Sequence, residues 1–345
     1  MSGKNYQNLK EEVWDTGICS GCGACVAVCP ADAIVFSHDG DTTSPVQTGY
    51  CKEVTDNVPC GACYAVCPRT NAQQESRMGK TGIGKHSGIF AAHAGFDVQN
   101  RQSGGAVTAI LVNALEEGLI DAVVTVTADP WTQQPQSAVI TKTDVLIAKA
   151  GSRYAWWVPM LAALKSAVVT QKCETIAVVG VPCAVSAARL MASSDHDLLK
   201  PFGRAIRLII GLFCTETFDY GMLIRDKITS EMAIEPWEIA KLDVRGKLIV
   251  ACTDGTTQEI PLQALDDCVR PGCHACGDLT AVDADISAGS IGSPEGETTL
   301  IVRTPAGVGF VNHAIDAGRL VIADESCDLT AIEKLARKKS ERIHK

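Results

Sequence analysis

Cysteine spacing near the start of the chain constrains its fold more than any other feature of the sequence. Of the 16 cysteines, eight lie within residues 19–67, and they form two similar runs. The first run is Cys19-x2-Cys22-x2-Cys25-x3-Cys29-Pro30, and its last part recurs as Cys60-Gly-Ala-Cys63-Tyr-Ala-Val-Cys67-Pro68. Residues 1–12 are polar and contain no apolar signal region, so we interpret these cysteines as metal ligands rather than disulfide partners.

The internal repeat predicts an N-terminal ferredoxin-like domain with two [4Fe–4S] clusters. In such a run, three thiolates hold one cube and the fourth holds the other. Pseudo-symmetry then assigns one cluster to Cys19, Cys22, Cys25 and Cys67, and the second to Cys29, Cys51, Cys60 and Cys63. Cys51 precedes Cys60 by an unusual nine positions, so a three-iron cluster without Cys51 is the alternative there. A zinc site or unrelated free thiols are the alternatives for the whole pattern.

Length and charge limit the remaining possibilities. A chain of 345 residues exceeds one ordinary domain. Its net charge of −9, without a basic block ahead of the C-terminal stretch, argues against nucleic acid as a partner. The longest apolar runs, such as 205–213, are too short for a transmembrane segment. We expect a cytoplasmic protein that can also dock peripherally at the cytoplasmic face of the membrane.

Beyond a Gly/Lys-rich linker at 78–85, the pattern changes to alternating helices and strands. We therefore divide the chain into a ferredoxin-like domain at 1–80 and an α/β body with a mixed sheet at 81–345. The predicted strands are 121–127, 175–179 and 206–213, with short strands and turns in 241–260. The predicted helices are 105–117, 156–169, 184–191, 220–228, 307–317 and 329–342.

Four body cysteines are candidates for a third cluster. Cys183 and Cys214 each follow a predicted strand, and the carboxyl ends of parallel strands meet at one edge of a sheet. The pair Cys273-x2-Cys276 could complete a set of four with them. Two alternatives remain open on spacing alone: Cys183 and Cys214 as small buried hydrophobic residues, and Cys268 as a rival ligand.

Two glycine-containing segments are candidates for binding a phosphate. Gln102-Ser103-Gly104-Gly105 stands directly before a predicted helix that carries Thr108, where exposed amides and the helix dipole favour an anion. A serine cap with turn glycines is the plain alternative. Gly151-Ser152-Arg153-Tyr154 opens the next predicted helix with a cation and an aromatic ring, and a solvated cap is its alternative. Gly79-Lys80-Thr81 lacks the earlier glycine of a P-loop, and no dinucleotide-binding glycine fingerprint occurs.

The order of these motifs resembles the family of coenzyme F420 hydrogenase/dehydrogenase beta subunits. The series comprises 101–105, 151–154, Gly180-Val-Pro182-Cys183, Gly211-Leu-Phe-Cys214 and Cys273-x2-Cys276-x-Asp278. The resemblance implies an α/β flavoprotein that binds FAD and exchanges hydride with coenzyme F420. It implies a body cluster on Cys183, Cys214, Cys273 and Cys276. It implies FAD contacts from Gln102, Ser103, Gly104, Gly105, Thr108, Ser152, Arg153 and Tyr154, with Gly180 and Pro182 admitting close backbone approach.

The fused two-cluster segment is most similar to the electron-input subunits of reduced-F420 dehydrogenases in methanogenic or related archaea. Such subunits dock on a complex-I-like membrane assembly, and a free ferredoxin is another possible acceptor. The alternatives are a beta subunit of an F420-reducing hydrogenase or of a formate dehydrogenase, or a non-catalytic iron–sulfur relay. Hydride transfer between bound cofactors needs no obligatory acid or base, so we expect no catalytic side chain.

Overall fold

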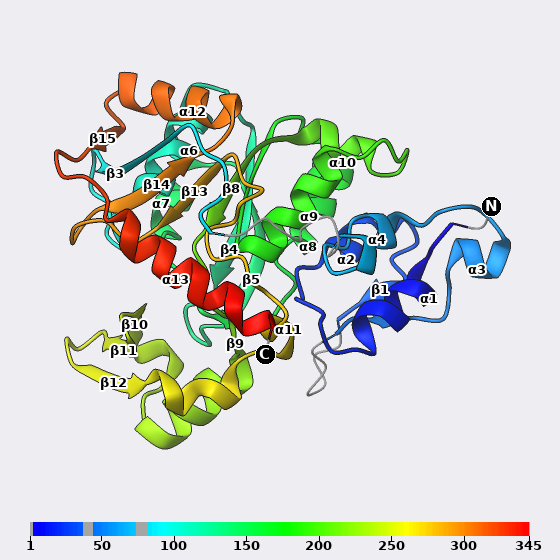
Figure 1. The fold of residues 1–345 in the computed structure, drawn as a ribbon, viewed down its shortest axis with the longest axis horizontal. Helices are drawn as coiled ribbons and strands as arrows, with labels where there is room; N and C mark the ends of the chain where they lie inside the picture. Colours follow the sequence, from blue (N-terminus) through cyan, green and yellow to red (C-terminus); the bar gives the residue numbers. More distant parts are fainter. Residues whose placement is uncertain (1–2, 37–43, 74–81, 345) are drawn as a thin grey trace.

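The computed structural model describes residues 3–36, 44–73 and 82–344, and shows an α/β body with a smaller cysteine-rich segment beside it (Figure 1). Residues 79–81, where the sequence lacks a full P-loop, and the predicted domain boundary after residue 80 lie outside the described residues. In Figure 1 the N-terminal segment lies to the right of the body, and the end of the chain returns to the face between them. The boundary itself therefore stays a prediction.

A mixed eight-stranded sheet forms the centre of the body, as the alternating pattern predicted. Its order is β15-β3-β14-β13-β8-β7-β4-β5, and the four strands β13, β8, β7 and β4 run parallel. Antiparallel strands extend the sheet on both sides. The bounds are β3 Gly88–Ala94, β4 Ala122–Ala128, β5 Pro135–Ile140, β7 Ile176–Gly180, β8 Ile206–Leu212, β13 Ile286–Gly289, β14 Thr298–Val302 and β15 Leu320–Ile322.

Helices cover both faces of this sheet, because its central strands are apolar on both sides. Residues 176–179 of β7 are all buried, and side chains of successive positions pack against opposite layers. One core joins the sheet to α6 and α12, and the other joins it to α8, α9 and α10. The bounds are α6 Ala106–Glu116, α7 Thr143–Ala148, α8 Ala162–Lys165 with a π-helical extension Ser166–Thr170, α9 Pro182–Ala192, α10 Lys200–Ala205, α12 Pro305–Asp316 and α13 Leu329–Glu341.

A small antiparallel sheet, β10-β11-β12, lies apart from the large one with its own apolar core. The turns predicted at Arg245-Gly246 and Asp254-Gly255 connect its strands. Cys268 is buried in this core, together with Leu265 and Ile239. The elements here are β6 Ala155–Trp156, β9 Phe218–Asp219, the π-helical segment Gly221–Glu231, two 3-10 segments Pro236–Glu238 and Leu262–Cys268, β10 Ile239–Val244, β11 Lys247–Cys252, β12 Thr257–Pro261 and α11 Pro271–His274.

The duplicated cysteine runs fold in the same way. Gly23 and Gly61 occupy equivalent positions, both have positive φ (80° and 73°), and each begins a short helix. Such a backbone favours glycine, because a side chain there would be strained. The elements are α1 Tyr6–Leu9, a π-helical turn Lys10–Trp14, α2 Ala24–Val28, α3 Lys52–Asp56, α4 Ala62–Ala65 and an antiparallel pair of strands, β1 Ile34–Val35 and β2 Val46–Gln47.

The cysteine-rich segment shares a hydrophobic core with the body. Ala27, Val28 and Val66 pack in the same cluster as Leu161 and Leu164. The Leu161 amide donates to the Cys22 carbonyl at 2.9 Å, and the Trp156 indole Nε1 donates to the Gly21 carbonyl at 3.0 Å. These contacts fix the two parts relative to each other.

The predicted helix 156–169 was wrong in its first half. Residues 155–156 form the strand β6, paired in parallel with β9, and helix α8 begins only at Ala162. Pro159 explains the difference, because proline disfavours helical geometry in the preceding residue. The prediction that Gly151–Tyr154 opens a helix was also wrong, since this segment leads into β6. The remaining predicted helices and strands occur within a few residues of their expected bounds.

Candidate functional site

The second cysteine set lines a cavity in the N-terminal segment. Cys29, Cys51, Cys60 and Cys63 all face it, and its volume is about 400 Å³ including its opening to solvent. Cys51 directly precedes α3 as its N-cap residue, and this short helix spans part of the gap between Cys51 and Cys60. The amide of Ala33 donates to the Cys29 sulfur at 3.4 Å. We call these four cysteines the outer set.

The first cysteine set lines a neighbouring cavity of about 320 Å³, whose walls include Cys19, Cys22, Cys25 and Cys67. We call these four cysteines the inner set. Burial, followed by repulsion from the other thiols of the set and from Cys63 of the outer set, raises the pKa of Cys25 well above its ordinary value. The inner and outer sets therefore adjoin, as expected for a pair of ferredoxin clusters.

The four body cysteines also come together, and we call them the body set. Cys183 lies in the first turn of α9 directly after β7, and Cys214 follows β8. Burial and repulsion from Cys273 and Cys276 raise the pKa of the Cys214 thiol to about 12. The Thr217 amide donates to the Cys273 sulfur at 3.3 Å. Cys22 lies close enough to Cys183 for repulsion between them to add to burial in raising the pKa of the Cys183 thiol, so the body set adjoins the inner set.

The chemistry of these donors fits iron–sulfur cubes. Burying several thiolates together is unfavourable unless positive charge compensates them, and the irons of a cube provide it while taking one thiolate each. Among the described residues, no three His, Cys, Asp or Glu side chains converge tightly enough for a single metal ion. A cube instead needs its ligands spread around it, and two of the three sets line a cavity. The sets therefore suit clusters better than a zinc ion.

The predicted phosphate loop is held tightly between the two sheets. Gly104 donates its amide to the Thr298 hydroxyl at 2.9 Å, and a Cβ at Gly104 would lie 2.5 Å from the Ala92 carbonyl oxygen. Ser103 shares a hydrogen bond with Thr298 at 2.8 Å. Gln102 donates to Asp243 at 2.9 Å. Thr108, one turn into α6, is half-buried.

Arg153 is the strongest candidate for an anion contact. Its Nη1 donates to the Ser152 carbonyl at 3.1 Å, while its buried Nε has no hydrogen-bond partner. Burial lowers the pKa of this guanidinium, and no acidic neighbour contributes to the shift. Asp243 lies beside Tyr154 and also accepts from Gln102, so the two predicted segments meet there. A buried cation with an orphaned donor fits the phosphate of a bound cofactor.

Gly180 and Pro182 lie at the body set rather than in either of those segments. Gly180 ends β7, where a Cβ would lie 2.9 Å from the Ala184 Cβ and 3.6 Å from the Met160 sulfur. Pro182 is the first residue of α9, directly before Cys183. Their positions suit close backbone approach at the carboxyl edge of the sheet.

Three buried cations near the body set were not predicted. Lys339 is 3% exposed and donates to the carbonyls of Cys214 and Asp278. Lys339 is therefore buried although it lies in the basic part of α13. The helical spacing indicates this burial, because Lys339 continues the buried stripe of Ile332 and Ala336. The other two cations, Arg69 and Arg270, lie directly after Cys67-Pro68 and three residues before Cys273.

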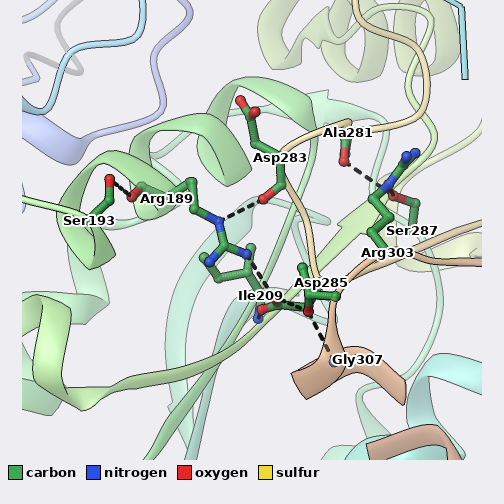
Figure 2. Close-up of polar contacts among 10 residues, drawn as sticks. Arg189, Ser193, Ile209, Ala281, Asp283, Asp285, Ser287, Arg303 and Gly307 are labelled. Carbon is green, nitrogen blue, oxygen red and sulfur yellow. Dashed lines mark hydrogen bonds and ion pairs between the residues drawn. The ribbon is translucent and has the colours of Figure 1, made fainter. Parts of the chain in front are cut away.

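A polar network at the opposite, amino end of the parallel strands holds the sheet edge in place (Figure 2). The buried Asp285 carboxylate, at the start of β13, accepts from the Ile209 amide at 2.8 Å. It also accepts from the Thr304 hydroxyl and from Arg189, both at 2.7 Å. Arg303 donates to Ser287 at 2.8 Å. These bonds join β8, β13, α9 and α12, and two of these elements, α9 and β8, carry Cys183 and lead to Cys214.

Family comparisons agree with this arrangement of an iron–sulfur segment on an α/β body. Residues 12–35 match a 4Fe-4S binding domain. Residues 89–165 and 173–328 match the N-terminal and C-terminal parts of the coenzyme F420 hydrogenase/dehydrogenase beta subunit. The chain belongs to this family, and the resemblance inferred from its motifs is confirmed. No helix in the described part of the chain is long and apolar enough to cross a membrane.

Several relatives match most of the chain. An uncharacterised protein of Methanocaldococcus jannaschii is 43% identical over 99% of both chains. One subunit of the F(420)H(2) dehydrogenase of Methanosarcina mazei is 31% identical over 88% of this chain and 84% of its own. The coenzyme F420-dependent sulfite reductase of M. jannaschii is 32% identical over 99% of this chain, which spans about half (52%) of that protein.

A solved structure shares the fold of the body. One chain of the F420-reducing [NiFe] hydrogenase complex from Methanosarcina barkeri superposes with a TM-score of 0.70 and 29% identity. The match covers 76% of this chain and 91% of that chain. The mixed α/β fold predicted from the sequence is therefore confirmed.

Proposed function

We propose that the chain oxidises reduced coenzyme F420 by hydride transfer to FAD and passes single electrons through three [4Fe–4S] clusters. The electrons would go to a partner, either a complex-I-like membrane dehydrogenase or a ferredoxin. The observation that supports this proposal most is the series of three cysteine sets. The body set adjoins the inner set through Cys183 and Cys22, and the inner set adjoins the outer set through Cys25 and Cys63.

The ends of this series have different surroundings. The body set lies at the carboxyl edge of the parallel strands, where α/β sheets bind ligands. The outer set lies in a cavity lined in part by the exposed Tyr50 and by the first residues of α3, and α3 is the part of the N-terminal segment that lies farthest from the body in Figure 1. Such a location suits an exit toward a partner protein. We infer that electrons enter in the body and leave at the outer set.

The proposed FAD site consists of the loop Gln102–Gly105 with Thr108, the segment Ser152–Tyr154, and the backbone at Gly180 and Pro182. Arg153 would bind a phosphate, and Gly104 lets the loop pack closely against β3 and β14, which fixes its position. When bound, FAD would supply the conversion between a hydride pair and single electrons, which deazaflavins and cubes cannot perform between themselves. The side chains named here position the cofactor and exclude water, and none has to move a proton.

A beta subunit that serves an F420-reducing hydrogenase or a formate dehydrogenase is the second candidate. The matching chain of the hydrogenase complex supports it. The fused ferredoxin-like segment favours the first candidate, since the match to the M. mazei dehydrogenase component extends over 88% of this chain. A non-catalytic relay would contain iron but no flavin.

Anaerobic purification with joint measurement of iron, sulfide and flavin tests the proposal. We expect about twelve iron atoms per FAD, since each cube holds four. We also expect oxidation of reduced F420 with an artificial one-electron acceptor. The Cys183→Ala variant should fall to about eight iron atoms, while Cys173→Ala, a matched control outside the three sets, should keep all of them. A reconstituted protein without flavin and without F420 oxidation would refute the proposal.

A further inference from the structure

Three positively charged side chains converge on the body set from segments far apart in the sequence. Arg69, Arg270 and Lys339 are only 8%, 2% and 3% exposed. They come from the N-terminal segment, from the residues before α11 and from α13. Burying a charge is unfavourable without a compensating partner. Asp278 acts on Lys339 and Asp219 acts on Arg270, and thiols of the body set act on all three cations.

Lys339 is fixed by two backbone acceptors of the body set. Its Nζ donates to the Cys214 carbonyl at 2.5 Å and to the Asp278 carbonyl at 2.8 Å. These acceptors flank the set, one on the loop after β8 and one two residues after Cys276. The Lys339 ammonium therefore already lies beside the body set in this structure. Its electrostatic effects fall on Cys214, Cys276, Cys273 and the acid Asp278.

Arg69 and Arg270 lie between the body set and the inner set. Arg69 donates to the carbonyls of Gly272 and Ala275, on either side of Cys273. Arg270 donates to the Ser20 carbonyl at 2.6 Å and stacks on the Trp156 ring, with its guanidinium carbon 3.9 Å from the ring centroid. Arg69 acts on Cys22 and Cys67 as well as on Cys276. Arg270 acts on Cys19 and Cys273.

The hydrogen bonds place these cations where their charge reaches the body set. Lys339 bonds the Cys214 carbonyl, and Arg69 bonds the carbonyls on either side of Cys273. Their positive field would favour an added electron on a cube, because reduction makes the cube more negative. Such a field acts strongly in a site of low dielectric constant. Net charge and hydrogen bonds near the sulfurs are known determinants of cluster potential.

We propose that Lys339, Arg69 and Arg270 are positioning residues that raise the reduction potential of the body cluster. Lys339 acts on this cluster, whereas the two arginines act on it and on the inner cluster together. The inference rests on the proposed function only in assuming that the body set holds a cube. Its consequence is that the body cluster accepts electrons readily and shares part of its charge environment with the next cluster in the series.

Redox titration of the holoprotein, followed by electron paramagnetic resonance, tests the proposal cluster by cluster. The signal missing in Cys183→Ala identifies the body cluster. In Lys339→Met we expect the equilibrium constant for reduction of this cluster to fall at least tenfold, a shift of about 59 mV downward for one electron. Lys339→Arg keeps the charge and should restore the potential. Lys338→Met, on the exposed side of the same helix, should leave all potentials unchanged.

Arg69→Gln provides the second, independent variant. We expect it to lower the potentials of both the body and the inner cluster, and to leave that of the outer cluster unchanged. If Lys339→Met fails to assemble the body cluster, Arg69→Gln decides alone. A body signal that is present but unshifted in the neutral variants would overturn this inference. A wild-type protein with no third signal would instead refute the three-cluster part of the proposed function.

Discussion

Replacing Asp285 by alanine should destabilise the body without changing its cofactor content. The carboxylate is 6% exposed and accepts three hydrogen bonds, from the Ile209 amide, the Thr304 hydroxyl and the Arg189 guanidinium. Removing one partner of a buried ion pair costs about 3–5 kcal/mol. Arg189 is 34% exposed and can regain water, so we expect the lower end of this range, about 3 kcal/mol.

The loss has a structural route to the whole body. The Thr304 hydroxyl also caps α12 by accepting from the Gly307 amide at 3.2 Å, and Asp285 orients that hydroxyl. The same carboxylate fixes the Ile209 amide in the middle of β8. Without it, one strand, one helix start and one arginine lose a shared acceptor.

Thermal unfolding of the anaerobic holoprotein at a fixed scan rate measures the effect. A loss of about 3 kcal/mol corresponds to a decrease in Tm of roughly 4 °C in a chain of this size. Asp285→Asn keeps one acceptor oxygen and should lose about half as much. Ser193→Ala removes an exposed hydroxyl that bonds the Arg189 carbonyl at 2.8 Å and serves as the matched control. A decrease in Asp285→Ala no larger than in Ser193→Ala would refute the reasoning.

Three further predictions concern the cofactor sites. Gly23→Ala places a Cβ 2.2 Å from the Pro159 Cβ, so we expect fewer iron atoms per chain and a lower Tm. The control Gly3→Ala, whose Cβ meets nothing within 4 Å, should change neither. Normal iron content in Gly23→Ala would contradict this prediction. Arg153→Met should weaken flavin binding at least tenfold, because a hydrogen bond to a charged group contributes about 1.5–3 kcal/mol. Equilibrium dialysis measures the flavin affinity, with a substitution of the exposed Arg204 by methionine as the control. Unchanged flavin affinity in Arg153→Met would exclude a phosphate contact. A chelator should remove the outer cluster first, because its cavity opens to solvent near Tyr50; simultaneous loss of all resonance signals would count against that order.

Most of the cysteine sets could be predicted from the sequence. The duplicated cysteine runs have a spacing that few structures other than cubes require, so their placement around two cavities followed from the sequence. Cys183 and Cys214 were also expected to meet, because strand ends in a parallel sheet converge. Cys51 could be paired with its set only by symmetry, and α3 shows how the chain brings it there.

Long-range contacts account for what the sequence did not predict. The antiparallel strands β3, β14 and β15 were not anticipated, because their apolar residues gain meaning only when paired across more than two hundred positions of sequence. Arg69 and Arg270 have no periodic pattern that marks them as buried. The early helix at 156–169 was predicted from apolar spacing, although Pro159 argued against it. The prediction followed the apolar spacing, whereas Pro159 correctly indicated that the helix begins later.

The position of Lys339 on α13 has a consequence for the order of biosynthesis. The ligand residues of the body set, 183–276, leave the ribosome well before residue 339 does. Until α13 forms and docks, the four thiols lack the ammonium that bonds the Cys214 and Asp278 carbonyls. Cluster delivery to the nascent chain would therefore meet a site that is still open and less positive. Docking of α13 would then cover this site and add the charge of Lys339 to it.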